Sequence, residues 1–400
     1  MHSERDCVIA GGGPAGMVLG YLLARAGLRV TVLEKHADFL RDFRGDTIHP
    51  STLTVLGELG LRERFLELPL SRVRSMDLVV DGARLTLADF GTLPSPDDFL
   101  VFAPQWDFLN FLAREGSALA GFELLMNTEA TDVIIEADTV RGLRAVGPQG
   151  AIELRAPLTV AADGRTSRIR DAVGFVPDEL GVPIDVLWFD LPKPADPPPP
   201  TLGYLDARGM VLTLDRGDRY QGGLVIRKGE FDDLQAAGIE ELRATVASIA
   251  PVLAPVVGSL RDFDQVKLLS VQLNRLPRWH RDGFIAIGDA AHAMSPVGGV
   301  GVNYAIQDAV ALANAVVPEL AEGRVVSATL ERVQRRRIAP VRTMQRIQRI
   351  VHDRIAQAAP RGRALPAPAR GLLRVAAPVV RRVMARIIGL GFRPEHVAKG

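Results

Sequence analysis

Residues 7–16 read Cys-Val-Ile-Ala-Gly-Gly-Gly-Pro-Ala-Gly, a short apolar run that leads into a glycine turn. The turn fits the pattern G-x-G-x-x-G through Gly11, Gly13 and Gly16, with Pro14 and Ala15 inside it. Glycines at these places allow a tight turn, a close approach of backbone to a pyrophosphate, and close packing of a helix on a strand. A second β-branched run follows at residues 30–33, so we expect a βαβ unit whose helix N-terminus faces the phosphates.

The acidic residue that belongs to such a unit is also present. Glu34 lies 18 residues beyond Gly16, at the end of the second expected strand, and Lys35 follows it. A carboxylate there can accept hydrogen bonds from both hydroxyls of an adenosine ribose, and it disfavours a 2′-phosphate. The N-terminal segment therefore predicts a dinucleotide site that includes Glu34 and Lys35.

Two distant segments narrow the choice of dinucleotide. Residues 161–170 read Ala-Ala-Asp-Gly-Arg-Thr-Ser-Arg-Ile-Arg, and residues 283–292 read Gly-Phe-Ile-Ala-Ile-Gly-Asp-Ala-Ala-His. Each places an aspartate, Asp163 or Asp289, at the carboxyl end of an apolar strand, where ligands bind in open α/β sheets. Taken singly, an Asp beside Gly after a strand is an ordinary turn signal.

Together with the glycine turn, these segments resemble the para-hydroxybenzoate hydroxylase-like aromatic hydroxylases, which are class A flavoprotein monooxygenases. The resemblance covers approximately residues 5–350 and implies FAD as the cofactor. It implies that Asp289 binds the ribityl chain and that Asp163 lies near FAD and the pyridine nucleotide. Arg44 and Gln105 match residues beside the cofactor. The loop along the isoalloxazine would include Pro296, Gly299, Gly301, Val302 and Asn303.

The loop departs from the commoner family pattern at two positions, because Ser295 precedes Pro296 and Val300 stands where Gln is commoner. Its glycines would let backbone approach a flat ring, and a helix that opens near Asn303 would favour negative charge at one edge of that ring. For His292 we prefer a role in ordering the loop by hydrogen bonding to a role as a general base.

The resemblance also implies the chemistry. NADH or NADPH would reduce FAD transiently, and O₂ would give a flavin C4a-hydroperoxide that hydroxylates an aromatic or polyketide-like hydrophobic molecule. Two alternatives stay open: a flavin-dependent dehydrogenase or epoxidase acting on a quinone or terpenoid, and a flavin-binding protein without turnover. The sequence identifies no catalytic residue, and we expect no metal.

The predicted fold class is α/β, with a doubly wound, Rossmann-like FAD-binding domain, an inserted and mainly antiparallel substrate sheet, and a C-terminal helical tail. The FAD-binding domain would comprise residues 1–74, 100–184 and 274–340, the substrate domain residues 75–99 and 185–273, and the tail residues 341–400. Candidate substrate contacts in the inserted sheet are Trp188, Tyr204, Tyr220 and Arg227. Each of them is more simply explained as a core or surface residue of the sheet.

The formal net charge of +1 over 400 residues conceals an asymmetry. From Arg324 to Gly400 there are 18 basic and three acidic residues, whereas residues 1–323 hold 30 basic and 44 acidic ones. We favour packing of the basic helices on the acidic body over peripheral membrane or partner contact. Nucleic acid is disfavoured because no aromatic residues interleave with the arginines. A single cysteine, Cys7, and no signal pattern lead us to expect a cytoplasmic protein, with its oligomeric state left open.

Overall fold

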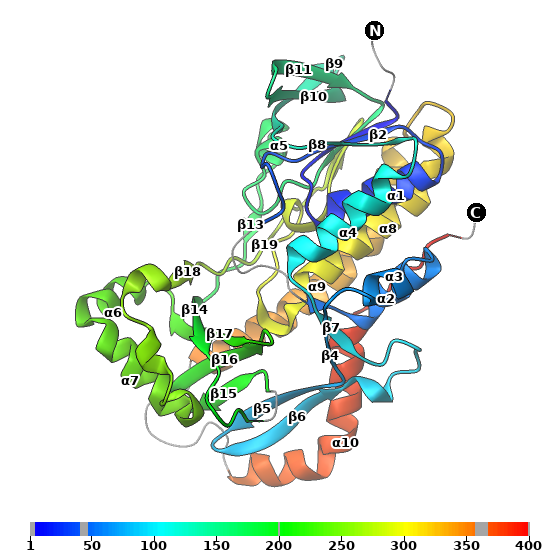
Figure 1. Ribbon diagram of the computed structural model, residues 1–400. Coiled ribbons are helices and arrows are strands. Elements are labelled where there is room, and N and C mark those ends of the chain that lie inside the picture. Colours follow the sequence, from blue (N-terminus) through cyan, green and yellow to red (C-terminus); the bar gives the residue numbers. More distant parts are fainter. Residues whose placement is uncertain (1–4, 41–46, 199–200, 357–366, 399–400) are drawn as a thin grey trace.

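The computed structural model describes residues 5–40, 47–198, 201–356 and 367–398 (Figure 1). Within these residues the centre is a six-stranded sheet, parallel except for one edge strand. In sheet order its strands are β20 (His280–Arg281), β21 (Phe284–Ala286), β12 (Leu158–Ala161), β1 (Cys7–Ala10), β2 (Val30–Leu33) and β8 (Phe122–Leu125). β1 pairs with β2 on one side and with β12 on the other, so the order reverses at β1. The predicted doubly wound α/β class is confirmed.

Both faces of this sheet are covered. One face packs against α1 (Pro14–Arg25), α4 (Gln105–Ser117) and α8 (Gly301–Leu320), and the other against β9 (Glu129–Glu136), β10 (Thr139–Gly147) and β11 (Gly150–Arg155). Strands β1, β2 and β12 are therefore buried along their whole length, which explains their unbroken apolar runs. Helix α8 is long and apolar enough to cross a membrane, but most of it is buried in this core.

A seven-stranded sheet forms the second layered unit. In sheet order its strands are β18 (Lys267–Leu269), β14 (Ile184–Pro192), β17 (Arg219–Arg227), β16 (Gly209–Asp215), β15 (Gly203–Asp206), β5 (Ser75–Val80) and β6 (Ala83–Asp89). All neighbours are antiparallel except β5 and β15. The two segments expected to build the inserted sheet, 75–99 and 185–273, thus meet through a single parallel pair.

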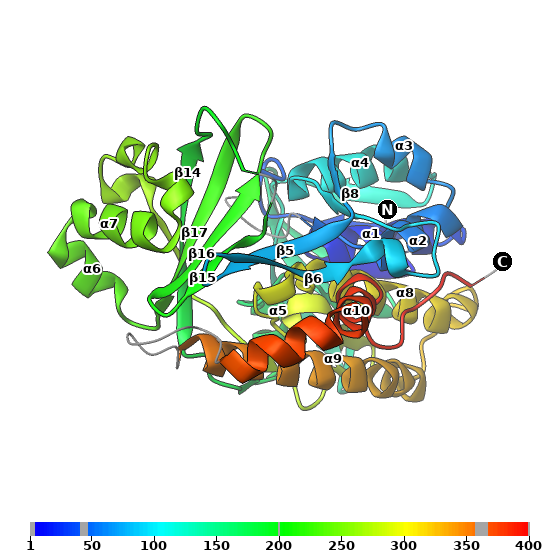
Figure 2. The ribbon, with the colours of Figure 1, turned by 90° about the horizontal axis from the view of Figure 1, so that it is seen from below.

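The two faces of the seven-stranded sheet have different neighbours (Figure 2). Helices α6 (Phe231–Ala237) and α7 (Ile239–Ile249) cover one face, which we call the outer face. The opposite, inner face is turned toward the Rossmann-like part. Because side chains alternate along a strand, Leu187 and Phe189 pack under α7, whereas Val186 and Trp188 belong to a separate cluster on the inner face.

The C-terminal helices lie along the body of the protein. Helix α9 (Ser327–Ala356) packs against α8, and α10 (Ala367–Gly389) packs against β6. Ala385 and Ile388 of α10 are buried in a cluster with Met76 and Phe90. The domain boundary expected between residues 340 and 341 falls inside α9, which continues through Pro340 as one helix.

The remaining elements connect these layers. A small sheet of β3 (Thr47–Ile48), β7 (Leu100–Phe102) and β4 (Ser71–Val73) lies between the two larger ones in the chain path. β13 (Asp178–Glu179) pairs with β19 (Asn274–Arg275). The short helices are α2 (Pro50–Glu58), α3 (Arg62–Leu66) and α5 (Arg168–Ala172). Helix α2 begins with Pro50 at its first position and ends at Glu58, with Leu59 as its C-cap.

We expect Gly222→Ala to destabilise the protein, because the new Cβ would lie 2.2 Å from Cε2 of the buried Phe189 ring on the neighbouring strand. Overpacking of this kind costs about 1–3 kcal/mol. Thermal unfolding should show a lower Tm for this variant. Gly258→Ala is the matched control, since no atom lies within 4 Å of its Cβ position. An equal Tm for the two variants would contradict the prediction.

Candidate functional site

In the glycine turn (residues 11–16), Gly11, Gly13 and Gly16 are each required for a different structural reason. Gly11 has a φ of +105°, and a Cβ there would lie 2.3 Å from the carbonyl oxygen of Ala162. A Cβ on Gly16 would lie 2.0 Å from the carbonyl oxygen of Gly11. Among the described residues, no atom lies within 4 Å of the Cβ position of Gly13, and no side chain caps α1, which begins at Pro14. An open backbone beside an uncapped helix N-terminus fits a diphosphate.

Glu34 lies beside this turn, at the end of β2. Its Oε2 accepts a hydrogen bond from the backbone N–H of Gly12 at 3.2 Å, and its Oε1 accepts one from His36 at 3.1 Å. The side chain is largely buried, whereas Lys35 is exposed. The carboxylate is therefore held in place by the backbone on both sides of it, next to the space above Gly13.

Asp163 has a structural task of its own. Its carboxylate accepts hydrogen bonds from the hydroxyl of Ser167 and from the backbone N–H of Ile169, the latter at 3.1 Å. Burial raises the pKa of Asp163, although these donors oppose the change. Asp163 thus stabilises the turn that leads into α5. Arg165, two residues later, contacts the second expected site, which contains Asp289.

That other site is the Asp289 turn (residues 288–292), which follows β21. The guanidinium of Arg165 lies 3.4 Å from Oδ2 of Asp289, whose side chain is about one-third exposed. A Cβ on Gly288 would lie 3.2 Å from Cβ of Ala15 in α1. The structure therefore brings the Asp289 turn, Arg165 and the glycine turn together at one edge of the parallel sheet.

His292 closes the Asp289 turn and is buried. Its Nε2 lies 2.6 Å from Oδ2 of Asp308 in α8, and the same oxygen accepts the backbone N–H of Gly288 at 3.1 Å. This confirms the expected role of His292 in ordering the turn by hydrogen bonding. Sequence reasoning did not single out Asp308, the group that receives both bonds.

The glycine-rich loop (residues 295–303) leads from the Asp289 turn into α8. Gly298 and Gly299 adopt φ values of +82° and +62°, and the carbonyl of Gly299 accepts a hydrogen bond from the hydroxyl of Thr47 at 2.9 Å. The side chain of Asn303 accepts from the backbone N–H of His49 at 3.0 Å and donates to the carbonyl of Thr47 at 3.3 Å. Helix α8 begins at Gly301, two residues before the expected start.

The remaining residues that were expected near the cofactor lie at the following positions in the fold. Pro296 is the N-cap of the short turn at residues 297–299, and Val302 is buried in the first turn of α8. Gln105 is the first residue of α4, shortly after β7, the strand that pairs with β3. Arg44 lies outside the described residues.

Helix α9 supports the glycine-rich loop from behind. Gln348 donates to the carbonyls of Ser295 and Val297 at 3.0 and 2.9 Å, and Gln345 donates to the carbonyl of Ala293 at 3.2 Å. Nε2 of His352 lies 2.7 Å from the hydroxyl of Ser295, and burial lowers the pKa of His352 to about 4. Sequence reasoning did not single out these residues; their signal is a series of polar side chains, Gln345, Gln348 and His352, at helical spacing.

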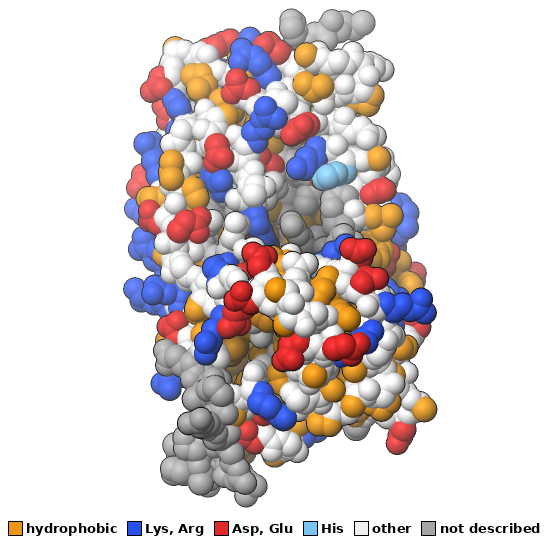
Figure 3. Space-filling model, turned by 90° about the vertical axis from the view of Figure 1, so that its left-hand side faces the viewer, with side chains coloured by type: hydrophobic (Ala, Val, Ile, Leu, Met, Phe, Trp, Pro, Cys, Tyr) orange, Lys and Arg blue, Asp and Glu red, His pale blue; other side chains and the backbone are white. Residues whose placement is uncertain are grey.

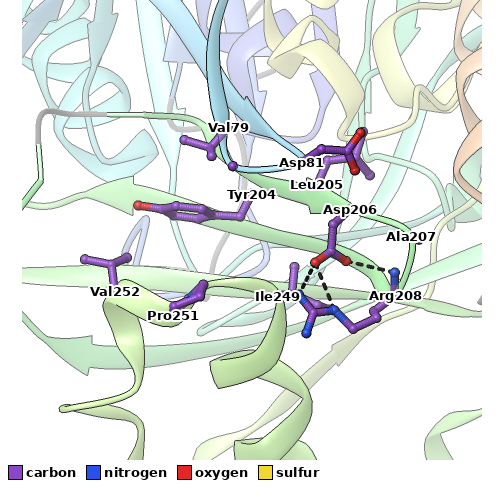
Figure 4. A pocket seen from close by; sticks show the side chains of 11 residues that line it. Val79, Asp81, Tyr204, Leu205, Asp206, Ala207, Arg208, Ile249, Pro251 and Val252 are labelled. Carbon is purple, nitrogen blue, oxygen red and sulfur yellow. Dashed lines mark hydrogen bonds and ion pairs between the residues drawn. The ribbon is translucent and has the colours of Figure 1, made fainter. Parts of the chain in front are cut away.

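The candidate substrate contacts are not brought together. Tyr204 and Tyr220 lie on the outer face under α7, and Arg227 is exposed beside Glu230. Tyr204 lines an open pocket of about 670 Å³ on that face (Figure 4), and none of the expected FAD-contacting residues lines it. Tyr204 and Tyr220 are core residues and Arg227 is a surface residue, as the simpler explanation expects, and a substrate contact by these three stays a prediction. Trp188 belongs to the inner-face cluster, and Arg227, which pairs with Ile184 of that cluster, lies on the same side of the sheet at its end.

Comparison with known proteins identifies the family. Residues 4–347 match the family described as FAD binding domain. A 6-methylpretetramide 4-monooxygenase from Streptomyces rimosus is 31% identical over 96% of this chain and 92% of its own length. A dialkyldecalin synthase from Streptomyces rugosporus is 29% identical, over 76% of this chain and 63% of its own length.

The fold is shared with p-nitrophenol 4-monooxygenase PnpA from Pseudomonas putida DLL-E4, with a TM-score of 0.78, 20% identity and 97% of each chain covered. The glycine turn with its open Gly13, the buried Glu34 and the Asp289 turn have a geometry that is compatible with a bound dinucleotide. The chain belongs to the FAD-binding-domain family, and it is an FAD-dependent oxidoreductase of the monooxygenase class.

Proposed function

We propose that this enzyme hydroxylates an aromatic or polyketide-like hydrophobic small molecule, using O₂ and either NADH or NADPH. The observation that carries the proposal is that helix α9 contacts both the glycine-rich loop, through His352 and Ser295, and the inner-face cluster of the seven-stranded sheet, through Ala356. Figure 3 shows the surface hollowed between the Rossmann-like part and the lobe of α6 and α7. The monooxygenase relative that is named for 6-methylpretetramide supports the same substrate class.

The residues that would hold FAD come from three segments. The glycine turn, with Pro14 and Ala15, would hold the pyrophosphate, and Glu34 with Lys35 would face the adenosine ribose. Asp289 would hold the ribityl chain beside Arg165. Bound FAD would accept electrons from the pyridine nucleotide and would then activate O₂. The chain's own task is to orient substrate against the ring and to exclude water from it.

The inner face offers an apolar wall for the substrate. Along β16 the side chains of Met210, Leu212 and Leu214 are only half-buried, although the face is turned inward. Leu212 and Leu214 pack with Trp188, whose side chain is buried and whose indole N–H has no hydrogen-bond partner among the residues that the structure describes. One hydrogen-bond donor surrounded by apolar side chains is suited to binding a hydrophobic molecule that carries a few oxygen atoms.

The inner face is also tied to the glycine-rich loop. Ala356, near the end of α9, packs against the inner-face cluster that contains Trp188. One turn earlier, His352 bonds to Ser295 at the start of the loop. Helix α9 therefore contacts both walls of the proposed substrate site. We assign no catalytic base.

A second candidate function has support in one relative. The dialkyldecalin synthase is named for ring formation rather than oxygenation, so a chain of this family could hold FAD without transferring oxygen to its substrate. A dehydrogenase or epoxidase acting on a quinone or terpenoid is the other rival. The synthase and the dehydrogenase differ from the hydroxylase because no oxygen atom enters their product, whereas an epoxidase would add one oxygen atom across a carbon–carbon double bond.

We propose a cytoplasmic enzyme whose basic tail serves mainly internal packing. Ala385 and Ile388 support this because they are buried against the body. Val379 and Val383 stay exposed near Arg381 and Arg382, so peripheral contact with an anionic membrane is the alternative. Flotation of the full chain with anionic vesicles would detect such contact.

The oxygen reaction separates oxygen transfer from the two functions without it, and the structure of the product separates a phenol from an epoxide. With an aromatic panel compound that stimulates NAD(P)H oxidation, the product should gain one ¹⁸O atom from ¹⁸O₂ and none from labelled water, as measured by mass spectrometry. Reduced protein mixed rapidly with O₂ should show a transient absorbance before the oxidised flavin returns. Direct reoxidation without that transient, with and without the panel compounds, would contradict the hydroxylase proposal.

Asp289→Ala should weaken FAD binding, because it removes the carboxylate proposed to accept hydrogen bonds from the ribityl chain. Loss of a charged hydrogen bond corresponds to about a tenfold to hundredfold change in Kd. Titration of the apoprotein with FAD, followed by flavin fluorescence, measures it. Asp282→Ala, at an exposed aspartate before β21, is the matched control. Full flavin content in the Asp289 variant would refute the assigned role.

Trp188→Phe should raise the KM for the substrate about two- to tenfold, because it removes one buried hydrogen-bond donor from the inner face. Tyr220→Phe is the matched control, since Tyr220 lies on the outer face. Steady-state kinetics with both variants makes the comparison. A parallel change in the two KM values would place substrate recognition elsewhere.

A further inference from the structure

A chain of buried charges runs from the Asp289 turn to the C-terminus. Asp308 is fully buried in α8, and its Oδ2 accepts the N–H of Gly288 and bonds to His292. Its Oδ1 accepts from Nε of Arg337 in α9 at 2.9 Å. The pKa of Asp308 is lowered: burial acts in the opposite direction, but His292 and Arg337 outweigh it. Asp308 is therefore a carboxylate that holds the turn from within the core.

Arg337 links these buried charges to the C-terminal segment (residues 391–398). Its NH1 lies 3.3 Å from Oε1 of Glu395 and 3.4 Å from the carbonyl of Arg393. Glu395 is 3% exposed and also accepts from Nε of Arg336 at 2.7 Å. The backbone N–H of Glu395 donates to the side chain of Gln307, one residue before Asp308. Figure 2 shows this segment leaving α10 beside α8.

The four charges balance only when the C-terminal segment is in place. Asp308 and Glu395 carry two negative charges, and Arg336 and Arg337 carry two positive ones. Without Glu395, the buried guanidinium of Arg337 would have Asp308 as its one carboxylate partner in the part of the chain that the structure describes. Removing one member of a buried charge pair is costly, because the charge that remains is no longer compensated. Arg337 would then shift toward solvent or Asp308, and Asp308 is the group that holds Gly288 and His292.

A second attachment of the C-terminal segment provides an internal comparison. Glu58 in α2 accepts the backbone N–H of Val397 at 2.7 Å, and its other oxygen lies 2.6 Å from Nδ1 of His396. This attachment is exposed and contacts neither Asp308 nor the Asp289 turn. The C-terminal segment is thus attached to the body at two places, through Glu395 to Arg337 on the side of the Asp289 turn and through His396 and Val397 to Glu58 away from it.

We propose that the C-terminal segment is a structural part of the FAD site, and that Glu395 and Arg337 are positioning residues which hold the Asp289 turn through Asp308. The inference rests on the proposed contact between Asp289 and FAD. Coupling between two sites is reciprocal, so bound FAD must hold the C-terminal segment as strongly as that segment favours FAD. A residue with a merely structural role would alter stability without this reciprocity.

The first test measures FAD binding to the apoprotein of the full chain. Glu395→Gln keeps the size of the side chain and removes its charge, so the FAD Kd should rise on the order of tenfold. His396→Ala, which loses only the exposed attachment, should leave the Kd within about twofold, as surface changes usually do. Arg336→Gln, at a half-exposed member of the chain, should give a smaller rise than Glu395→Gln.

The second test needs no variant, so misfolding cannot obscure it. Amide hydrogen exchange of residues 391–398 in the wild-type protein should be slower with FAD bound than in the apoprotein. Unchanged exchange in this segment together with an unchanged Kd in Glu395→Gln would overturn the inference. The Asp289→Ala titration keeps the two proposals apart: if that variant loses FAD while these two readouts stay flat, only the coupling is wrong. If Asp289→Ala retains FAD, the Asp289 contact itself is wrong.

Discussion

The close approach of three backbone segments at the end of β1 is the constraint on which the rest of the fold depends. Gly11 lies against the carbonyl of Ala162 after β12, and Gly16 lies against the carbonyl of Gly11. At both places a Cβ would sit closer than 2.5 Å to a backbone oxygen, which no small shift of a side chain could relieve. This contact sets how α1 leaves the sheet and leaves Gly13 open toward the ligand side.

A second feature of the core is that its polar groups are used for positioning. Asp308, Gln345, Gln348 and His352 are buried, and each bonds to the Asp289 turn, to the glycine-rich loop or to the segment between them. Burying such groups is tolerated because nearly all of their bonds are formed. A loop rich in glycine has little stiffness of its own, so the two helices α8 and α9 supply the order that the loop lacks.

The part of the candidate site whose residues belong to short sequence motifs could be predicted from the sequence. The glycine turn, Glu34 and Asp289 sit at the ends of apolar strands, and the topology of a parallel sheet brings such ends to one edge. The inserted sheet was harder, because a strand alternates its faces and a list of aromatic residues does not say which face is inward. Tyr204 and Tyr220 pack under α7, while Trp188, adjacent to a residue of that cluster, faces the opposite way.

By itself, the sequence determined the Rossmann-like class, the FAD family and the contrast between an acidic body and a basic tail, since all three depend on motifs or counts. Tertiary structure alone decided how the tail is used. Glu395 is one of three acids among 18 basic residues, and nothing local marks it as the partner of Arg337. Its role arises because α8, α9 and the segment after α10 meet in one place, where a buried guanidinium needs a second carboxylate.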